Sequence, residues 1–424
     1  MDTIFALSSG AAPAGIGVIR VSGPQAFAAV ERIAASLPPP RTARVRALRD
    51  GRGALLDRAL VLLFPGPASA TGEDLAELHC HGGRAVIAAV LATLRGQPGL
   101  RPADAGEFTR RALTHGRIDL AEASGLADLL SADTERQRIA ALSAAEGVVS
   151  RQVRSWLDRL GGLAASIEAQ LDFADEDDVA ADDAALASVR AGKAALAMDL
   201  RTVLANPPVE RLRDGVHVVL AGPPNSGKST LINLLSQRDL AIVSPIAGTT
   251  RDRIEATVTR DGLVYVLTDT AGLTDSDDPI ERIGVGRAEA SIAHADVLLW
   301  LGDDAPPRPS AMWVRARSDQ ADRAPVPGAA LEVAESDPAS IERLWVAIAG
   351  AGEALMPRTD ALAFRDAERQ ACRRALAMLE LGEDDPIVLA EQIRLAARTL
   401  GSILGIDATE AMLNTLFGQF CIGK

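Results

Sequence analysis

The 424-residue chain has few aromatic residues, few cysteines and no long uninterrupted apolar run. Aromatic residues make up 3% of the chain, so a hydrophobic core must be built mainly from Ala, Leu, Val and Ile. No stretch approaches the run of about 18 apolar residues that predicts a transmembrane helix. The first residues, Met1-Asp2-Thr3, lack the basic start and apolar core of a signal peptide. We therefore expect a cytoplasmic protein with no membrane association.

Cysteine is too sparse for a disulfide scaffold. The three cysteines, Cys80, Cys372 and Cys421, are odd in number and show no paired spacing, which suits a reducing compartment. His79-Cys80-His81 puts three possible metal ligands in a row, but alternate residues of a strand face opposite sides. His79 and His81 would then share one side and Cys80 the other. Because the sequence has no second cluster of this kind, we do not expect a zinc site.

Positive charge is also in deficit. Lys and Arg number 44 against 57 Asp and Glu, which gives a formal net charge of -13 at pH 7. Binding to nucleic acid depends mostly on neutralisation of phosphates by Lys and Arg. If this chain acts on RNA, it therefore needs a local basic patch or a partner that supplies one.

The N-terminal region, up to about residue 118, has the pattern of a compact α+β domain. Short β-like runs at 17–21 and 59–64 are separated by Gly- and Pro-rich turns, and 25–30 indicates a helix after a turn. The length of the whole chain predicts two to four domains, so further domains should follow.

The next region is helical. From Ala103 to Asn206 there is no proline, and apolar residues recur at helical spacing, as at Val153, Trp156 and Leu160. The acidic stretch 172–183 interrupts this pattern and is expected to be a solvated loop between two helices.

Strand-like and helix-like segments alternate between about residues 211 and 355, which is typical of an α/β domain. Strands are expected at 216–220, 264–267 and 297–301, and a later helix at 387–400. The fold class predicted is multi-domain: an α+β domain at 1–118, an all-α domain made of 119–210 and 356–424 packed together, and an α/β domain at 211–355 inserted between them.

A phosphate-binding loop is predicted at the start of the α/β domain. Gly222-Pro-Pro-Asn-Ser-Gly-Lys228-Ser229 fits G-x-x-x-x-G-K-[ST], follows an apolar strand and precedes a helix-like segment. The glycines let backbone N–H groups approach a phosphate at a helix N-terminus. Lys228 is expected to reach the β- and γ-phosphates and Ser229 to bind Mg²⁺. The flanking strand and helix argue against a chance glycine-rich loop.

Two further motifs follow in the order expected of a GTPase. Asp269-Thr-Ala-Gly272 ends a strand, where the acid can hold Mg²⁺ through water and Gly272 can face the γ-phosphate. Between the phosphate loop and Asp269, the segment Ala247-Gly-Thr-Thr-Arg-Asp252 offers Thr250 as a second Mg²⁺ ligand in a mobile switch. The predicted nucleotide-binding residues are Asn225, Ser226, Gly227, Lys228, Ser229, Thr230, Ser244, Gly248, Thr249, Thr250, Asp269, Thr270, Ala271, Gly272 and Asp319, with Lys228 and Thr250 also expected to take part in catalysis.

The motif that reads guanine in GTPases, Asn-Lys-x-Asp, is degenerate in this chain. Its expected place reads Ala316-Arg317-Ser318-Asp319. Asp319 can still accept hydrogen bonds from the guanine N1–H and exocyclic amine, the contact that rejects adenine. Loss of the Asn and Lys removes base packing and a hydrogen bond, each worth about 1 kcal/mol. We therefore expect GTP specificity with weakened affinity; the later base loop around 333–335 is also degenerate.

Other segments resemble the MnmE (TrmE) family of tRNA-modification GTPases, within the TrmE-Era-EngA-like P-loop GTPases. The resemblance lies in 2–6 and 15–24, in 71–83 (TGEDLAELHCHGG), in 106–112 and in the C-terminal Phe420-Cys-Ile-Gly-Lys424. With the GTPase motifs it covers the chain from end to end. It implies an N-terminal folate-binding-like domain that dimerises, a helical domain of two segments and an inserted GTPase domain.

The resemblance also implies an activity and its partners. Members of this family are K⁺-dependent GTPases that, with the FAD-dependent protein MnmG, install a carboxymethylaminomethyl or aminomethyl group on C5 of the tRNA wobble uridine. The one-carbon donor is 5-formyl-tetrahydrofolate or a related tetrahydrofolate. FAD would be held by the partner alone. A homodimer formed through the N-terminal domain and a heterotetramer with MnmG are expected.

Four positions match the family's folate contacts: Arg20, Glu77, Arg117 and Lys424. An arginine suits a folate carboxylate, and Glu77 could accept from pterin amino groups. The family usually has Lys where Arg117 stands, so the charge is kept but the geometry differs. Without the resemblance each would be interpreted as a surface or interface charge. Cys421 could be a catalytic thiol or merely an accessible one, and its role is left open.

The resemblance assigns further roles in the GTPase domain. Asn225, Ser244, Ile246 and Thr249 match K⁺ ligand positions, where the cation would replace an arginine finger. Glu281 matches the acid that orients the attacking water, although a glutamate at a helix start would also be ordinary.

Two other functions stay open at this point. The first is a GTPase switch that acts as a regulated binding module in ribosome assembly, without folate. The second is a folate-dependent one-carbon enzyme whose GTPase domain has decayed. The N-terminal segments and the FCIGK ending argue against the first. The degenerate Ala316–Asp319 motif favours the second, but the intact phosphate loop, Asp269–Gly272 and Glu281 argue against it.

Overall fold

The computed structural model describes residues 2–173, 183–236, 255–270, 291–319, 328, 331–358, 362–382, 385–406, 409–418 and 420–423. The chain divides into two compact units. Unit 1 consists of Met1–Ser131, Leu142–Lys193 and Leu381–Lys424, and unit 2 of Ala132–Ala141 and Ala194–Glu380. The domain boundaries predicted from the sequence at 118, 210 and 355 stay predictions.

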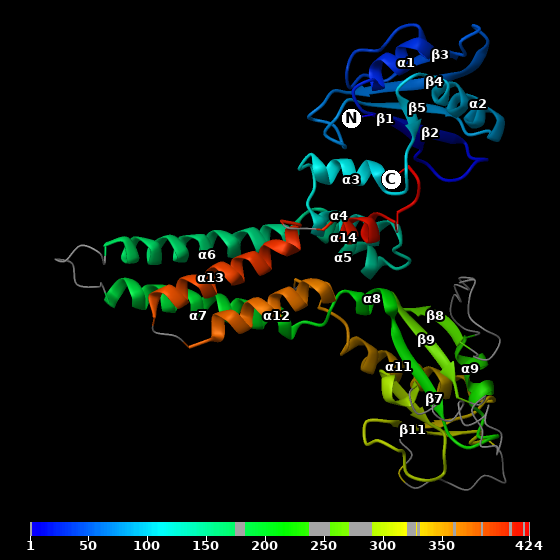
Figure 1. Cartoon of the computed structure of the whole chain (residues 1–424). Coiled ribbons are helices and arrows are strands. Elements are labelled where there is room, and N and C mark those ends of the chain that lie inside the picture. The colour runs from blue at the N-terminus through cyan, green and yellow to red at the C-terminus, as the bar shows by residue number, and fades with distance from the viewer. Residues whose placement is uncertain are drawn as a thin grey trace, which may run out of the picture. The chain divides into compact units, whose positions relative to one another are not determined.

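Unit 1 begins with a six-stranded sheet in the order β3-β4-β5-β2-β1-β6 (Figure 1). Two helices, α1 and α2, pack on one face of this sheet and bury side chains such as Ile19, Val30 and Leu78. The α+β fold expected for this region is confirmed. The elements are β1 (Thr3–Leu7), β2 (Ile16–Ser22), α1 (Ala26–Ala34), β3 (Arg44–Arg49), β4 (Leu55–Phe64), β5 (Leu75–His81), α2 (Arg84–Arg95) and β6 (Leu100–Pro102).

The opposite face of this sheet is partly covered by α3 (Glu107–Thr114). Phe108 of α3 packs on Ile4 and Ala6 of β1. Because side chains alternate along a strand, Arg20 of β2 points to this second face while its neighbours Ile19 and Val21 are buried under the helices. The expected folate contact Arg20 therefore lies on the face that α1 and α2 leave open.

The helical region follows and resumes near the C-terminus. It contains α4 (Leu120–Leu130), α5 (Glu135–Ala145), α6 (Val148–Phe173), α7 (Asp183–Ala205), α12 (Asp366–Glu380), α13 (Pro386–Gly401), the 3-10 turn η1 (Ser402–Leu404) and α14 (Glu410–Phe417). Along α6, Val153, Trp156 and Leu160 are fully buried, as their helical spacing indicates. The acidic loop was expected at 172–183, but α6 extends to Phe173 and α7 begins at Asp183; the remaining 174–182 lie outside the described residues.

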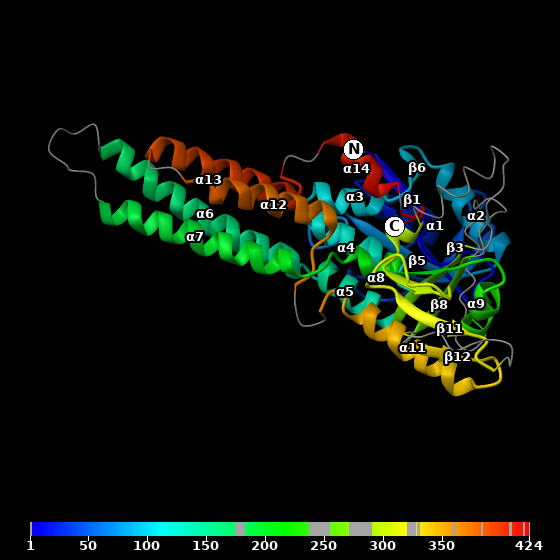
Figure 2. The same ribbon diagram turned by 90° about the horizontal axis from the view of Figure 1, so that it is seen from below.

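The two helical stretches of sequence pack together within each unit. In unit 1, α13 runs beside α6 (Figures 1 and 2), and Arg394 of α13 forms a 2.5 Å ion pair with Glu168 of α6. In unit 2, Arg369 of α12 donates to the carbonyls of Leu204 and Asn206 at the end of α7. The packing of the two halves inferred from the sequence is thus present. Among the helices of the described residues, none is both long and apolar enough to cross a membrane.

Unit 2 holds a second six-stranded sheet, in the order β12-β11-β10-β7-β9-β8. Neighbouring strands are parallel, except for the antiparallel pair β8 and β9. The elements are α8 (Glu210–Asp214), β7 (Val216–Ala221), α9 (Lys228–Ser236), β8 (Glu255–Arg260), β9 (Leu263–Asp269), β10 (Val297–Trp300), β11 (Met312–Ala316), β12 (Leu331–Val333) and α11 (Pro338–Glu353). The central strand β7 is apolar and buried except at His217, so its C-terminal end is a fixed platform for the loop that follows.

Candidate nucleotide-binding site

The predicted phosphate-binding loop connects β7 to α9. Lys228 is the first residue of α9, and its side chain turns back into the loop, where Nζ donates to the carbonyls of Gly222 at 2.9 Å and Pro223 at 2.8 Å. Only 4% of Lys228 is exposed, and burial lowers the pKa of its ammonium group. The positively charged ammonium group of Lys228 is therefore held at the N-terminus of α9, an arrangement suited to binding a phosphate.

Ser229 and Asp269 meet beside this loop. The Ser229 hydroxyl donates a 2.6 Å hydrogen bond to Asp269 Oδ2, and 6% of Asp269 is exposed. Asp269 ends β9, which pairs in parallel with β7, and the Thr270 hydroxyl donates to the Leu220 carbonyl at 2.8 Å. The strand pairing thus brings together two motifs that are about 40 residues apart. Their hydroxyl and carboxylate oxygens are the donors that Mg²⁺ prefers, so these residues fit that ion.

Several predicted positions lie outside the described residues: Ser244, Ile246, Gly248, Thr249, Thr250, Ala271, Gly272, Glu281 and Lys424. Their roles stay predictions. Of the expected K⁺ ligands, Asn225 lies in the described part of the chain, in the phosphate loop with a φ of 61°. Ser226 lies in the phosphate loop and Thr230 in the first turn of α9, as expected from their places in the motif.

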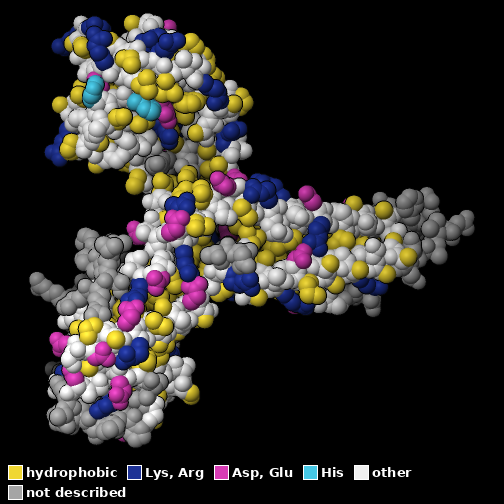
Figure 3. Space-filling view, turned by 180° about the vertical axis from the view of Figure 1, so that it is seen from behind, with side chains coloured by type: hydrophobic (Ala, Val, Ile, Leu, Met, Phe, Trp, Pro, Cys, Tyr) yellow, Lys and Arg dark blue, Asp and Glu magenta, His cyan; other side chains and the backbone are white. Residues whose placement is uncertain are grey.

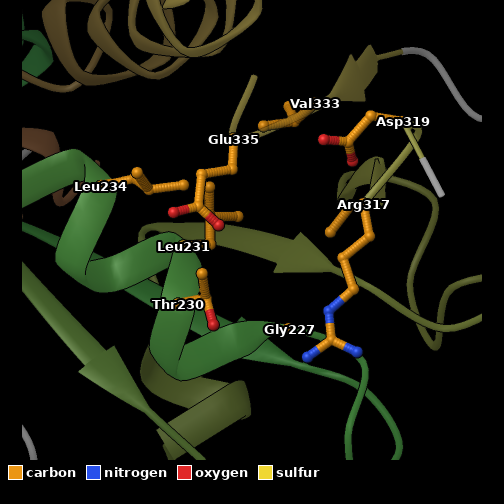
Figure 4. A pocket seen from close by; sticks show the side chains of 9 residues that line it. Gly227, Thr230, Leu231, Leu234, Arg317, Asp319, Val333 and Glu335 are labelled. Atoms are coloured by element: carbon orange, nitrogen blue, oxygen red, sulfur yellow. The ribbon is translucent and has the colours of Figure 1, made fainter. Parts of the chain in front are cut away.

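A pocket of about 260 Å³ opens beside the phosphate loop (Figure 4). Leu231 and Leu234 of α9 and Val333 of β12 provide apolar walls, and the Asp319 carboxylate points into the pocket. Ser336 Oγ donates to Asp319 Oδ2 at 2.7 Å, and this hydrogen bond lowers the pKa of the Asp319 carboxyl. Asp319 is therefore an ionised acceptor held in one orientation, as reading of the guanine edge requires. Ser336 was not predicted from the sequence.

Arg317 occupies the edge of the same pocket. Its backbone has a φ of 56°, and its side chain runs toward Gly227, away from Asp319 (Figure 4). A Cβ at Gly227 would lie 3.3 Å from Arg317 Nε, so the end of this side chain lies close against the phosphate loop. The sequence interpretation counted the base-packing side chain as lost. The structure instead places a long side chain there, ending in a flat guanidinium, which can stack on a base.

The N-terminal sheet brings together two of the four expected folate contacts. Arg20 and Glu77 are directly opposed on β2 and β5, and Arg20 Nε donates to Glu77 Oε1 at 2.9 Å. His79 Nε2 lies 3.1 Å from the other oxygen, Oε2. Burial would raise the pKa of Glu77, but the hydrogen bonds from His79 and Arg20 outweigh it and lower the pKa. Glu77 is thus an ionised acceptor on the open face, and His79 is a neighbour that sequence reasoning missed.

Of the other two expected folate contacts, Arg117 lies in the described part of the chain and Lys424 lies outside it. Arg117 follows α3 and its Cγ is 3.3 Å from where a Cβ of Gly72 would lie. Within the described residues it forms no hydrogen bond or ion pair with Arg20 or Glu77. The C-terminal signature does reach this sheet: Ile422 pairs with Ala105, and a Cβ on Gly423 would lie 2.1 Å from the Leu7 carbonyl oxygen of β1. Leu7 pairs with Ile19, the neighbour of Arg20.

The His79-Cys80-His81 sequence divides between the faces of β5 as expected. Cys80 is buried in the core, where burial and the charge of Asp57 raise the pKa of its thiol to about 12. His81 Nδ1 lies 2.7 Å from Asp57 Oδ1, while His79 contacts Glu77. In the described part of the chain no three His, Cys, Asp or Glu side chains are grouped for a metal ion. Cys421 is exposed.

Comparison with known proteins places the whole chain. Residues 3–117 match the family described as GTP-binding protein TrmE N-terminus, and residues 120–421 match the MnmE helical domain. A tRNA modification GTPase MnmE of Rhizorhabdus wittichii is 52% identical over 432 residues, covering 100% of this chain and 97% of that protein. The protein of the same name from Sphingopyxis alaskensis is 50% identical over 419 residues, covering 96% and 100%.

A solved structure also shows a distant likeness. A point variant of Aquifex aeolicus Era bound to GDP·AlF4⁻ is 22% identical, with 41% of this chain and 70% of that chain covered at a TM-score of 0.25. A score this low adds nothing to the assignment, which rests on the family matches and the full-length relatives. On those grounds this chain belongs to the MnmE (TrmE) family of tRNA modification GTPases.

Proposed function

We propose that this protein hydrolyses GTP and couples hydrolysis to modification of C5 of the tRNA wobble uridine, together with MnmG. The product would carry a carboxymethylaminomethyl or aminomethyl group, and 5-formyl-tetrahydrofolate or a related tetrahydrofolate would donate the one-carbon unit. The observation that carries the proposal is the joint placement of Lys228, Ser229 and Asp269 beside a pocket that contains Asp319. Phosphate-binding and base-reading groups thus lie at one edge of one sheet.

The described residues divide the work of binding GTP. Lys228 would neutralise the β- and γ-phosphates, and the backbone N–H groups of the loop would bind their oxygens. Asp319 would accept from guanine N1–H and the amine, while Arg317 packs on the base. Ser229, with Thr250, would hold Mg²⁺ directly and Asp269 would hold it through water; the ion would supply positive charge to the phosphate oxygens. Because adenine has no N1–H, Asp319 would favour GTP over ATP.

Hydrolysis itself would depend on Glu281, on residues 244–249 and on Asn225 of the phosphate loop. Glu281 would orient the attacking water, so that its lone pair lies in line with the γ-phosphorus. Asn225, Ser244, Ile246 and Thr249 would hold K⁺ through oxygen atoms, and this ion would supply the charge that an arginine finger supplies elsewhere. Asn225 fits this part, since its side-chain oxygen lies on the phosphate loop, two residues before Gly227.

A folate site on the open face of the N-terminal sheet is supported by three features. Glu77 is ionised and could accept from the pterin amino groups, and Arg20 beside it could bind a carboxylate. The C-terminal signature reaches β1 close to Arg20, which would put Lys424 and Cys421 near the same ligand. A homodimer formed through this N-terminal domain is proposed from the family match.

The test is reconstitution of the reaction in vitro. The purified protein, its MnmG partner with FAD, GTP, the folate donor and unmodified tRNA would be combined, and the wobble nucleoside would be analysed by mass spectrometry. We expect the modified uridine with this protein and none with Lys228→Ala, which loses the phosphate contact. Modification that proceeds unchanged with Lys228→Ala, or that never appears with the unaltered protein, would contradict the proposal.

A further inference from the structure

One edge of the N-terminal sheet carries a dense set of arginines in an otherwise acidic chain. The set, called here the arginine edge, lies on β3, on the hairpin after it and at the start of β4, and comprises Arg41, Arg44, Arg46, Arg49, Arg52 and Arg58. Figure 3 shows basic side chains gathered over this part of unit 1, with few acidic ones among them. The chain as a whole has a net charge of -13, so this region has a local charge opposite to that of the molecule.

The acids within the same segment do not neutralise these arginines. Asp50 Oδ1 accepts from the backbone N–H groups of Arg52 and Ala54, at 2.9 and 2.8 Å, and so closes the hairpin turn. Asp57 is 9% exposed and takes the backbone N–H and the ring Nδ1 of His81, both within 2.8 Å. Both carboxylates hold nearby backbone or the His81 ring and form no ion pair with these arginines in the described residues, so six arginines face two acids and the segment stays net positive.

The arginine edge also differs from other arginines in its partners. Within the described residues none of its six members forms an ion pair, whereas Arg101 and Arg111 in the same unit each bind carboxylates. Some of the six are oriented by carbonyl groups instead: Arg46 donates to Ser36 O at 3.1 Å and Arg49 to Gly53 O at 2.9 Å. Their charges are thus held at the surface without a carboxylate partner in the described residues.

The arginine edge is extended, as a polyanion is, and it surrounds the rim of the sheet: Arg44 and Arg46 lie on one face, and Arg58, which pairs with Ala47, lies on the other. β3 is the outermost strand of its sheet, so its free side faces solvent. Alternate residues of a strand are about 6.6 Å apart, and the six residues of β3 span about 20 Å, which is several nucleotides of a nucleic-acid strand. Guanidinium groups bind phosphate oxygens in pairs. A charged edge strand also resists pairing with other sheets, but that role needs no charge at Arg52 or Arg58.

We propose that the arginine edge binds the phosphate backbone of tRNA. The choice of tRNA rests on the proposed function; the choice of a nucleic-acid backbone rests on the uncompensated charge and its extent. Because the chain as a whole is negatively charged, RNA is favoured to approach where basic side chains gather, and the arginine edge is such a region. Nothing in this interaction reads sequence, because the contacts are to phosphates.

The test compares two variants of the full-length protein with equal charge changes. Arg44→Gln/Arg52→Gln/Arg58→Gln removes three exposed arginines of the edge whose side chains make no hydrogen bond among the described residues. Arg373→Gln/Arg374→Gln/Arg398→Gln removes three exposed arginines of α12 and α13 as the matched control. Binding of fluorescently labelled tRNA would be measured by anisotropy over a range of KCl concentrations, with intrinsic GTP hydrolysis measured alongside.

We expect the edge variant to bind tRNA roughly tenfold more weakly near 0.1 M salt, with the slope of log K against log salt reduced by about 2 to 3. The control should change affinity less than about twofold, and both should hydrolyse GTP normally. Equal losses in both variants, an unchanged salt slope, or no tRNA binding by the unaltered protein would overturn the proposal. If poly-L-glutamate displaced tRNA as well as unlabelled tRNA does, the edge would be a general anion surface and the assignment to RNA would fail.

GTP hydrolysis separates this proposal from the proposed function. A protein that binds tRNA through the edge but does not hydrolyse GTP would contradict the function and leave the edge assignment standing. If the protein hydrolysed GTP and modified tRNA equally well with and without the edge arginines, the proposed function would stand and the edge assignment would fail.

Discussion

The Ser229 hydroxyl donates a 2.6 Å hydrogen bond to the Asp269 carboxylate, across the C-terminal ends of two adjacent parallel strands. This contact joins the phosphate loop to the end of β9. Both groups offer oxygen atoms at the position where a nucleotide-bound Mg²⁺ would lie. A change in either residue should therefore alter the dependence of the enzyme on Mg²⁺ rather than its fold.

Replacing Ser229 with Ala should raise the Mg²⁺ concentration needed for half-maximal GTP hydrolysis by at least about tenfold, because a direct oxygen ligand is removed. Ser236→Ala is the matched control: it lies on the same helix and its hydroxyl bonds the Ile232 carbonyl at 2.7 Å, away from the loop. Titration of the hydrolysis rate with Mg²⁺ measures the effect. If both variants needed the same Mg²⁺ concentration, Ser229 would not be a ligand of the metal ion.

Arg317 is expected to strengthen binding of the base. Arg317→Ala should raise the Kd for GDP by roughly tenfold, since stacking of a guanidinium on an aromatic face contributes about 1–2 kcal/mol. Arg317→Lys should recover part of this loss, because it restores the alkyl chain and the charge but not the flat group. Fluorescence titration with a labelled GDP measures Kd, with the exposed Arg213→Ala as control. A Kd unaffected by Arg317→Ala would mean that the side chain does not cover the base.

Asp319 is expected to decide which base is accepted. Asp319→Asn should lower guanine affinity by about 3 kcal/mol, or roughly 100-fold, because the amide replaces one acceptor oxygen by a donor and removes the negative charge from the other. The amide should in turn favour xanthine, whose C2 carbonyl can accept from it. Competition between GTP and xanthosine triphosphate measures the change. Ser336→Ala should have a smaller effect of the same sign, and unaltered base preference in Asp319→Asn would show that another group reads the base.

Asp57 should contribute a pH-dependent part of the stability of unit 1. Burial would raise its pKa, but the hydrogen bonds from the His81 ring, the His81 N–H and the Arg58 N–H outweigh it and lower the pKa below its ordinary value. A group with a lowered pKa stabilises the fold above its unfolded pKa and loses that effect as the pH falls through the folded value. The contribution is therefore present at neutral pH and lost below about pH 4.

Thermal unfolding of Asp57→Asn tests this relation. At pH 7 the variant should be less stable by about 1.5–3 kcal/mol, the usual range for hydrogen bonds to a charged group. The difference from the unaltered protein should shrink as the pH falls below about 4. Asp104→Asn, whose side chain is 89% exposed, serves as control and should cost little at either pH. A destabilisation that is independent of pH would show that the charge of Asp57 is not what matters.

Local sequence patterns predicted much of the fold. The strands expected at 216–220 and 264–267 appear as β7 and β9, and the helix expected at 387–400 appears as α13 (Pro386–Gly401). These segments have clear apolar periodicity and distinct ends, so neighbouring residues settle their structure. The run expected at 59–64 is the second half of a longer strand, β4, because the buried Asp57 and a bulge in the β3–β4 pairing disturb its alternation.

Contacts between distant residues were beyond sequence reasoning. The pairing of Arg20 with Glu77 depends on the register between β2 and β5, which no local pattern sets. Ser336 reaches Asp319 because β12 lies beside β11. Arg317 crosses to Gly227 because of its positive φ, an uncommon conformation for arginine. Compared with Asn-Lys-x-Asp, the sequence Ala316–Asp319 is degenerate. The position of the Arg317 side chain shows that this residue can still pack on a base.

The most direct test of the central claim is GTP hydrolysis by the purified protein in K⁺ buffer and in Na⁺ buffer at equal ionic strength, with ATP as the control substrate. We expect the rate in K⁺ to exceed the rate in Na⁺ by a factor of up to roughly 10³–10⁵, which is what an arginine finger contributes. We expect no hydrolysis of ATP in either salt. Equal rates in the two salts would contradict the proposed K⁺ site at Asn225. Hydrolysis of ATP as readily as GTP would contradict the role given to Asp319.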